Sequence, residues 1–204
     1  MVSEPQTPRR ERERLRHRRE ILDAARRVLS ARGVEAFTIE HVAKEAEFAI
    51  GSIYRHFASK EELIDMIAAD LSEPLFAEAE ALAASDLPFE QQLERLVRAT
   101  LATLADDLPL IRAFGAGSGS ERLAPIRARY FEAFDAIVKN GQREGVIPKG
   151  ARAAKVVALM GLVAGFAKWR TFDALPKRFD AVPTIVGVWL GGVATATKRP
   201  RKGR

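Results

Sequence analysis

Residues 38–63 constrain the fold of this chain most strongly, because helix caps and short apolar faces alternate along them. Thr38 is a good N-cap, since its hydroxyl can accept a backbone N–H of the first helical turn. The apolar residues after it have the spacing of one helical face: Ile39, Val42, Ala43 and Ala46. Ile53 and Phe57 can anchor a second short helix, because residues four apart meet on one side of a helix. The pattern predicts two short helices around a tight turn.

The second helix has a polar face that suits contact with DNA. Within five residues it carries a hydroxyl, a phenol, a guanidinium and an imidazole: Ser52, Tyr54, Arg55 and His56. A short helix with such groups can be held against the DNA backbone while it enters the major groove. Ser59 and Glu62 form a capping box that starts a third helix, and Lys60 beside that N-terminus favours a phosphate. The alternative interpretation is a helical hairpin whose polar face is only solvated.

Together these motifs resemble the DNA-binding domain of the tetracycline-repressor (TetR) family of bacterial transcription regulators. The resemblance is strongest over residues 51–57 and 59–63, and it extends back through a predicted helix at 15–32 and its link at 33–38. It implies that four residues face base edges: Ala49, Ile50, Gly51 and Arg55. It implies phosphate contacts from five side chains: Thr38, Ser52, Tyr54, His56 and Lys60.

Two residues depart from the pattern of that family. The turn usually holds Gly where this chain has Glu47, and a positive φ suits Gly but not Glu. The turn is therefore either strained by about 1 kcal/mol or has another geometry. Ala49 replaces the usual capping hydroxyl of the second helix, which costs about 1 kcal/mol. Glu47 can offset part of that cost, because a carboxylate near a helix N-terminus is favourable.

The charges of this basic chain are unevenly distributed. Residues 1–19 hold seven Arg and three Glu, a net charge of +4, whereas residues 20–70 hold six Lys or Arg and ten Asp or Glu, a net charge of −4. Because cation–phosphate contacts and counterion release drive DNA binding, we predict that an Arg-rich arm supplies much of the affinity by entering a narrow minor groove. We expect Arg9, Arg10 and Arg12 to contact DNA. The other Arg residues of the arm are Arg14, Arg16, Arg18 and Arg19. The alternative is a solubilising disordered tail.

Helical spacing dominates the rest of the chain, which predicts an all-α protein. With the resemblance, we expect an N-terminal three-helix helix-turn-helix DNA-binding domain and a larger C-terminal helical domain for ligand binding and dimerisation. The expected segments are a flexible arm at 1–13, the DNA-binding domain at 14–60, the regulatory domain at 61–197 and a disordered basic tail at 198–204. The expected helices lie at about 12–31, 39–46, 50–57, 60–84 (kinked or broken at Pro74), 88–105, 108–114, 121–144, 151–173 and 182–197, with a flexible connector at 115–120.

The last two helices favour self-association, because Gly is costly inside a helix, by about 1 kcal/mol, unless backbones approach closely. They are apolar almost all round and need burial on more than one side. The resemblance implies a homodimer in which they pack against their copies in a four-helix bundle. The candidate interface residues are Met160, Gly161, Gly165, Val188, Trp189, Gly191 and Gly192. A two-fold dimer also fits a palindromic operator with half-sites about one helical turn apart. The alternative is that both helices fill the core of a single chain.

The resemblance also implies a pocket for a small effector in the C-terminal domain. Apolar and aromatic walls suit a hydrophobic ligand, and the candidate lining residues are Phe76, Leu104, Phe114, Tyr130, Phe134, Phe166 and Trp169. Each of them could equally be ordinary core. The expected mechanism is a population shift, in which the ligand binds best to a state whose DNA-binding domains are wrongly spaced for the operator. Repression is the regulatory sign that the family implies.

Catalysis, metal binding and membrane insertion find little support in the sequence. Cysteine is absent, which fits a reducing cytoplasm, and we expect neither cofactor nor metal. All three His lie in the first 56 residues, and His41 with Glu45 is expected to form a surface hydrogen bond. The apolar runs at 156–167 and 181–197 are short or weakly hydrophobic, so we expect buried helices there. Two further alternatives remain, a protein that coats DNA regardless of sequence and a regulator without an effector.

Overall fold

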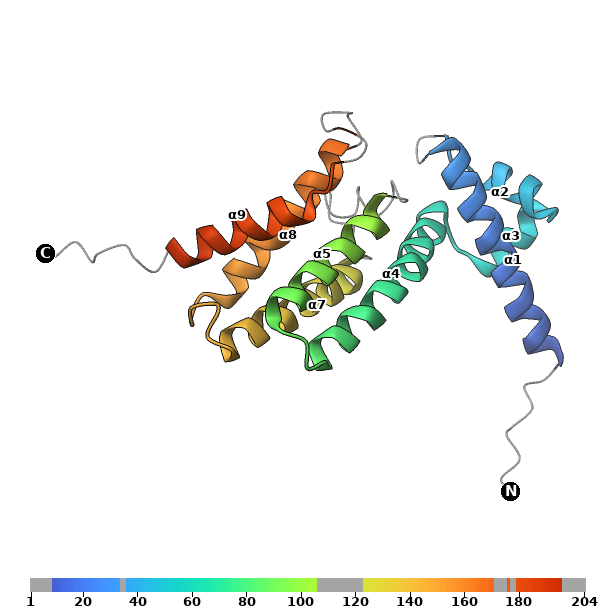
Figure 1. The fold of residues 1–204 in the computed structure, drawn as a ribbon. Helices are drawn as coiled ribbons and strands as arrows, with labels where there is room; N and C mark the ends of the chain where they lie inside the picture. The colour runs from blue at the N-terminus through green and yellow to red at the C-terminus, as the bar shows by residue number, and fades with distance from the viewer. Residues whose placement is uncertain (1–8, 34–35, 106–122, 171–175, 177–178, 196–204) are drawn as a thin grey trace, which may run out of the picture. The chain divides into compact units, whose positions relative to one another are not determined.

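The computed structural model describes residues 9–33, 36–105, 123–170, 176 and 179–195, and all regular structure in these residues is α-helical (Figure 1). The all-α prediction is therefore confirmed. The chain forms two compact units, residues 1–69 and 70–204. The boundary between the units falls within helix α4 (Lys60–Ala84).

The N-terminal unit is built on α1 (Arg9–Arg32), α2 (Ile39–Ala46) and α3 (Ile50–His56). α1 packs against α2, and α2 packs against α3. Their apolar faces and the start of α4 form one core, and its most deeply buried side chains are Ile21, Ala24, Ala25, Phe37, Val42, Ile53, Phe57, Leu63 and Ile67. The spacing that predicted two short helices therefore also identified the residues that hold them.

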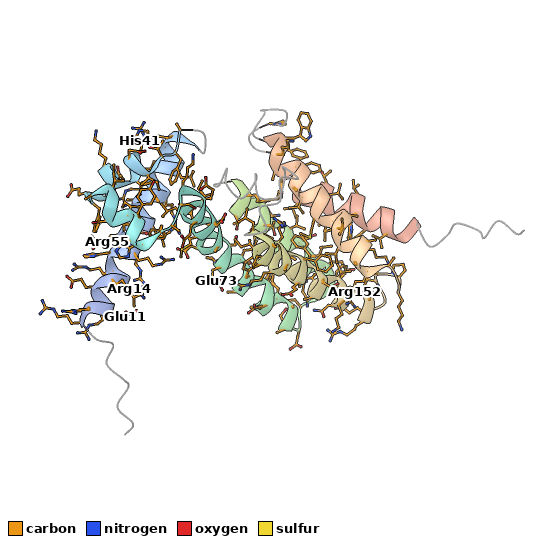
Figure 2. All side chains as sticks on the ribbon, turned by 180° about the vertical axis from the view of Figure 1, so that it is seen from behind. Glu11, Arg14, His41, Arg55, Glu73 and Arg152 are labelled. Atoms are coloured by element: carbon orange, nitrogen blue, oxygen red, sulfur yellow. The ribbon has the colours of Figure 1, made fainter. Side chains whose placement is uncertain are left out.

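α1 begins earlier than predicted, at Arg9 rather than near residue 12. The flexible arm expected through residue 13 is thus partly wrong, since Arg9, Arg10 and Arg12 lie on the helix. Arg and Glu are good helix formers, and ion pairs three and four residues apart support this stretch. Glu11 pairs with Arg14 at 2.8 Å near the start of α1 (Figure 2), and Arg16 pairs with Glu20 at 3.5 Å.

The helix caps of the N-terminal unit follow the sequence. Thr38 Oγ1 accepts the His41 N–H at 3.3 Å, as an N-cap should. The Glu62 N–H donates to Ser59 Oγ at 3.1 Å, which confirms half of the capping box, but the Glu62 carboxylate accepts the Ala58 N–H at 2.6 Å instead of the Ser59 N–H. Ala49 precedes α3 without any side-chain capping bond, as its methyl group requires.

Glu47 adopts the left-handed conformation that the turn demands, with φ 57° and ψ 34°. The Phe48 N–H then donates to the Ala43 carbonyl at 3.0 Å, the long bond of a Schellman-type helix end. The sequence left open whether this turn is strained or differently shaped. The structure shows the left-handed geometry, so the strain of a side chain in this conformation applies.

We expect Glu47→Gly to raise the free energy of unfolding of the N-terminal unit by about 1 kcal/mol, because Gly has no Cβ to clash in this conformation. Chemical denaturation measures the change. Glu47→Ala is the matched control, since it removes the carboxylate and keeps the Cβ. Equal stabilities for the two variants would contradict the strain at this residue.

The C-terminal unit comprises the second part of α4 together with α5 (Phe89–Ala105), α7 (Ala124–Arg143), α8 (Arg152–Arg170) and α9 (Val182–Thr195). α5 packs against α7, α8 and α9, and α8 also packs against α7 and α9 (Figure 1). α4 continues through Pro74, so of the two predicted outcomes there, a kink or a break, the break is wrong and the kink stays a prediction. The predicted helix at 108–114 and connector at 115–120 lie outside the described residues.

A buried polar cluster fixes the turn between α4 and α5 onto α7. Asn140 Nδ2 donates to the Ala83 carbonyl at 2.9 Å and to Gln92 Oε1 at 2.8 Å, and Gln92 Nε2 donates to the Leu87 carbonyl at 2.8 Å. Next to Asn140, a Cβ added to Gly141 would lie 2.7 Å from the Phe89 ring. Satisfied polar groups of this kind specify one packing of the helices.

Among the described residues, no helix is long and apolar enough to cross a membrane.

Candidate functional site

α3 is held to the N-terminal unit by one side and offers the other side to solvent. Ile53 and Phe57 are fully buried, which confirms them as anchors, whereas Ile50, Gly51, Tyr54 and Arg55 are exposed (Arg55 is labelled in Figure 2). Arg55 Nη2 donates to Ser52 Oγ at 2.6 Å, so the hydroxyl orients the guanidinium. The helix therefore presents a hydroxyl, a phenol and a cation together, as the sequence predicted.

The remaining predicted DNA contacts lie around α3 in the N-terminal unit. Thr38 caps the start of α2, exposed Ala49 immediately precedes α3, and Lys60 begins α4. Lys60 is half-buried, with its ammonium 5.9 Å from the centroid of the Phe37 ring. The positions of all these residues fit the resemblance, and their contacts with DNA stay a prediction.

His56 lies in a cationic cluster that sequence patterns do not show. Its ring stands edge-on to that of His17 on α1 at 6.2 Å between centroids, and the His17 ring packs against Phe48 at 5.2 Å. Burial lowers the pKa of His56 from its ordinary value of 6.5, and repulsion from His17, Arg55, Arg18 and Arg14 lowers it further. The imidazole of the free protein is therefore largely uncharged at neutral pH.

A DNA phosphate beside His56 would favour the charged imidazolium and raise its pKa. Formation of the complex would then take up a proton. We expect the DNA affinity to rise as the pH falls through the window between the free and bound pKa values, by at most about tenfold per pH unit. Fluorescence anisotropy at constant ionic strength measures this dependence. His56→Gln should flatten it and His41→Gln should not, and identical profiles for the three proteins would rule out the coupling.

The predicted hydrogen bond between His41 and Glu45 is wrong. The His41 ring donates from Nδ1 to the Ala36 carbonyl at 3.0 Å, and Glu45 pairs with Arg27 Nε at 2.7 Å. Both side chains therefore tie α2 to its surroundings, His41 through the Ala36 carbonyl and Glu45 through Arg27 on α1. In the part of the chain that the structure describes, no cluster of three or more His, Asp and Glu could hold a metal ion.

Three of the predicted pocket residues, Leu104, Tyr130 and Phe134, line one apolar cavity of the C-terminal unit. Its volume is about 20 Å³, and a cavity of this size holds about one water. The rest of its lining comprises Thr100, Met160, Val163 and Ala164. Met160, which is predicted in the dimer interface, is half-buried and lines this cavity, and its interface role stays a prediction.

The other predicted pocket residues lie elsewhere. Phe76 is buried against Tyr130, with ring centroids 4.9 Å apart, and Arg129 lies over it at 4.2 Å while pairing with Glu73 at 2.6 Å (Glu73 is labelled in Figure 2). The hydrogen bonds from Arg129 hold the pKa of Glu73 below its ordinary value. Phe166 stacks on Phe179 instead of lining the cavity. Phe114 lies outside the described residues.

Trp169 is 59% exposed and does not line the cavity, which corrects its predicted place there. Trp189 differs from its prediction in the opposite sense, since it is buried within the chain. It was predicted in the dimer interface, but it is only 3% exposed and its Nε1–H donates to the Lys155 carbonyl at 2.9 Å. Because a buried indole N–H needs an acceptor, Trp189 joins α9 to α8 within one chain.

α8 and α9 both expose apolar side chains. Val157 on α8 is 59% exposed and Val188 on α9 is 57% exposed. The glycines predicted in the interface are exposed or half-buried, and a Cβ built on any of them would meet nothing within 4 Å: Gly161, Gly165, Gly191 and Gly192. A hollow of about 520 Å³, lined largely by small and apolar residues, lies between the two helices. Packing within a single chain therefore does not explain these glycines.

Comparison with known proteins finds a family match within the N-terminal unit. The model of a family described as bacterial regulatory proteins, tetR family, matches residues 21–67, which span most of α1, all of α2 and α3 and the start of α4. Residues 21–67 are therefore a TetR-family segment. The HTH-type transcriptional repressor KstR2 of Rhodococcus jostii is 38% identical to it over 80 residues. That match spans 39% of this chain and 39% of the repressor, so it covers less than half of either protein.

Solved structures match a larger part of the chain. The fatty acid degradation regulator FadR from Bacillus halodurans has a TM-score of 0.70 and 20% identity, over 85% of this chain and 98% of that one. The transcriptional regulator FadR from Bacillus subtilis, solved in complex with stearoyl-CoA, has a TM-score of 0.70 and 19% identity, over 86% of this chain and 98% of that one. At these identities the matches show only that this chain shares their fold.

Proposed function

We propose that the chain is a sequence-specific DNA-binding regulator of transcription, which acts as a homodimeric repressor and leaves its operator when a small hydrophobic ligand binds. The observation that carries the proposal is the exposed polar side of α3, anchored by Ile53 and Phe57, within the segment that matches the TetR family model. Such a helix can read base edges in the major groove while neighbouring groups bind phosphates. A repressor of this kind works in the cytoplasm, on the nucleoid when bound to DNA.

The exposed face of α8 and α9 supports the homodimer. Glycines inside a helix destabilise a single chain, by about 1 kcal/mol each relative to Ala, and at these positions an added Cβ would meet nothing within 4 Å. That cost is offset if the backbones of a second copy approach them. Four helices, two from each copy, would then bury Val157 and Val188. A two-fold dimer presents two copies of α3 and so requires a palindromic operator with half-sites about one turn of DNA apart.

The apolar cavity at Leu104, Tyr130 and Phe134 supports the proposal of an apolar effector. The effector would have to bind a state in which this cavity is larger. Its walls carry few polar groups, and its present volume of about 20 Å³ is far too small for an organic molecule. A ligand there must therefore favour a more open packing of α5, α7 and α8. Such a molecule can release DNA only if the open state binds the operator more weakly.

Competition binding tests the DNA-binding part of the proposal. We expect wild-type protein to prefer a selected operator duplex over a scrambled duplex by roughly 10³-fold or more at physiological salt, which is the usual range for specific binding. Affinities should be measured at several salt concentrations with excess competitor DNA. Equal affinity for both duplexes would favour the alternative function, a protein that coats DNA regardless of sequence.

Thermal stabilisation tests the effector. Hydrophobic compounds that raise the melting temperature should also weaken operator binding, since both effects follow from preference for one state. Enlarging a cavity residue, as in Ala164→Phe, should remove both effects, whereas Ala84→Phe on α4, outside this cavity, should leave them. Compounds that stabilise the protein and leave operator affinity unchanged would favour a regulator without an effector.

A further inference from the structure

Arg18 differs from the Arg residues around it because its guanidinium is turned into the protein. Its side chain is 31% exposed, whereas that of Arg16 is 64% exposed. Arg18 Nη1 donates to the carbonyl of His56 at 2.6 Å, and the guanidinium lies 4.4 Å from the centroid of the Phe57 ring. Its Nη2 contacts the sulfur of Met66 on α4. One side chain of α1 thus reaches the C-terminal end of α3 and the following helix.

Glu62 extends this contact into a clamp on the turn between α3 and α4. One of its carboxylate oxygens lies 4.0 Å from Arg18 Nη2, and the other accepts the Ala58 N–H at 2.6 Å. Arg18 and Glu62 therefore hold the turn on both sides of Phe57. Arg18 binds the carbonyl of the preceding residue, His56, and Glu62 binds the N–H of the following residue, Ala58. A cation at the carbonyl end of a helix is favoured further by the helix dipole.

We infer that Arg18 is a positioning residue that sets the orientation of α3 and thereby the sequence specificity of DNA binding. The inference rests on the proposed function. A planar guanidinium can donate to a carbonyl, lie over a ring and approach a carboxylate at once, which a Lys ammonium cannot reproduce. Because those contacts already occupy it, Arg18 adds no phosphate contact.

A positioning role for Arg18 predicts different effects on two measurable quantities, the specificity ratio and the dependence of affinity on salt. Contacts to base edges depend on the orientation of α3, so losing Arg18 lowers the preference for operator over scrambled DNA. Contacts to phosphates determine the slope of affinity against salt, at about 0.9 per phosphate contact, so losing Arg18 leaves that slope unchanged. A residue that only stabilises the fold would lower binding to both duplexes equally and leave their ratio intact.

The test uses the full chain with four proteins: wild type, Arg18→Gln, Arg18→Lys and Arg32→Gln. Arg32 is exposed on the same helix, lies outside the Arg-rich arm and loses the same charge, so it is the matched control. Affinities for the operator and for a scrambled duplex are measured at several salt concentrations, below the melting temperature of each variant. We expect Arg18→Gln to lower the specificity ratio about tenfold or more, the value of a misplaced base contact, with an unchanged salt slope. Arg18→Lys should recover part of the ratio, and Arg32→Gln should keep the wild-type ratio.

A salt slope that falls by about 0.9 with an unchanged ratio would show that Arg18 binds a phosphate, and it would overturn the inference. Equal loss of affinity for both duplexes would overturn it as well. Both results leave the proposed function intact, because the wild-type protein would still prefer its operator. A wild-type protein without any preference would instead overturn the proposed function, together with the inference that rests on it.

Discussion

Replacing Phe57 with alanine is expected to destabilise the N-terminal unit by about 3–5 kcal/mol, the usual range for a buried Phe, and to abolish DNA binding. Phe57 is fully buried at the end of α3, and the Arg18 guanidinium lies over its ring. Small domains have a total stability of only about 5–15 kcal/mol. The variant should therefore lose much of the folded population of residues 1–69 near physiological temperature.

Calorimetry of the full chain distinguishes this result from general unfolding. The melting transition of the N-terminal unit should shift down, while the helical signal and the association state of the C-terminal unit remain. Leu15→Ala is the control, because Leu15 is an exposed apolar residue of α1 and such changes stay within about 0.5 kcal/mol. If Phe57→Ala melted like the wild type and still bound the operator, Phe57 would not be the anchor of α3.

Introducing a charge at Val188 is expected to have the second large effect, a monomeric protein with weak DNA binding. Val188 stands on the exposed face of α9, and burying an unpaired carboxylate in an interface is strongly unfavourable. Val188→Asp should therefore separate the two copies. Because two linked binding sites exceed one in affinity by about 10²–10⁴-fold, operator affinity should fall by a factor in that range.

Light scattering after size-exclusion chromatography gives the association state of the variant, and anisotropy gives its affinity. Val146→Asp is the matched control, since Val146 is an exposed Val in the turn before α8. It should remain dimeric with wild-type affinity. A Val188→Asp protein that stayed dimeric would place the interface on another face, and the open glycines of α8 and α9 would then lack an explanation.

Local patterns of the sequence predicted most of the fold, because periodicity and capping depend on residues that are close in the chain. Thr38, Ser59, Ile53 and Phe57 have the predicted structural roles. The differences concern competition between local preferences. Pro74 does not break α4, one of the two predicted outcomes, since the apolar side chains around it are buried and packing stabilises the helix. Arg9 begins α1 because its neighbours form good ion pairs.

The candidate sites were less predictable, because they depend on contacts between residues far apart in the chain. The edge-on pair of His17 and His56 and the clamp by Arg18 join α1 to the end of α3, and no periodicity indicates them. The positions of Trp189 and Trp169 could not be predicted from local sequence either. An aromatic residue in a helix can face its own core or solvent, and only the packing of α8 against α9 decides between them.

Selection of bound duplexes from a random pool by the full-length protein tests the central claim most directly. The account predicts enrichment of a palindrome whose half-sites lie about one turn of DNA apart, since two copies of α3 must be related by the two-fold axis of the dimer. Half-site positions should lose their preference when Arg55 is replaced with Ala. A pool that remained random after repeated selection at physiological salt would contradict the claim that α3 reads a DNA sequence.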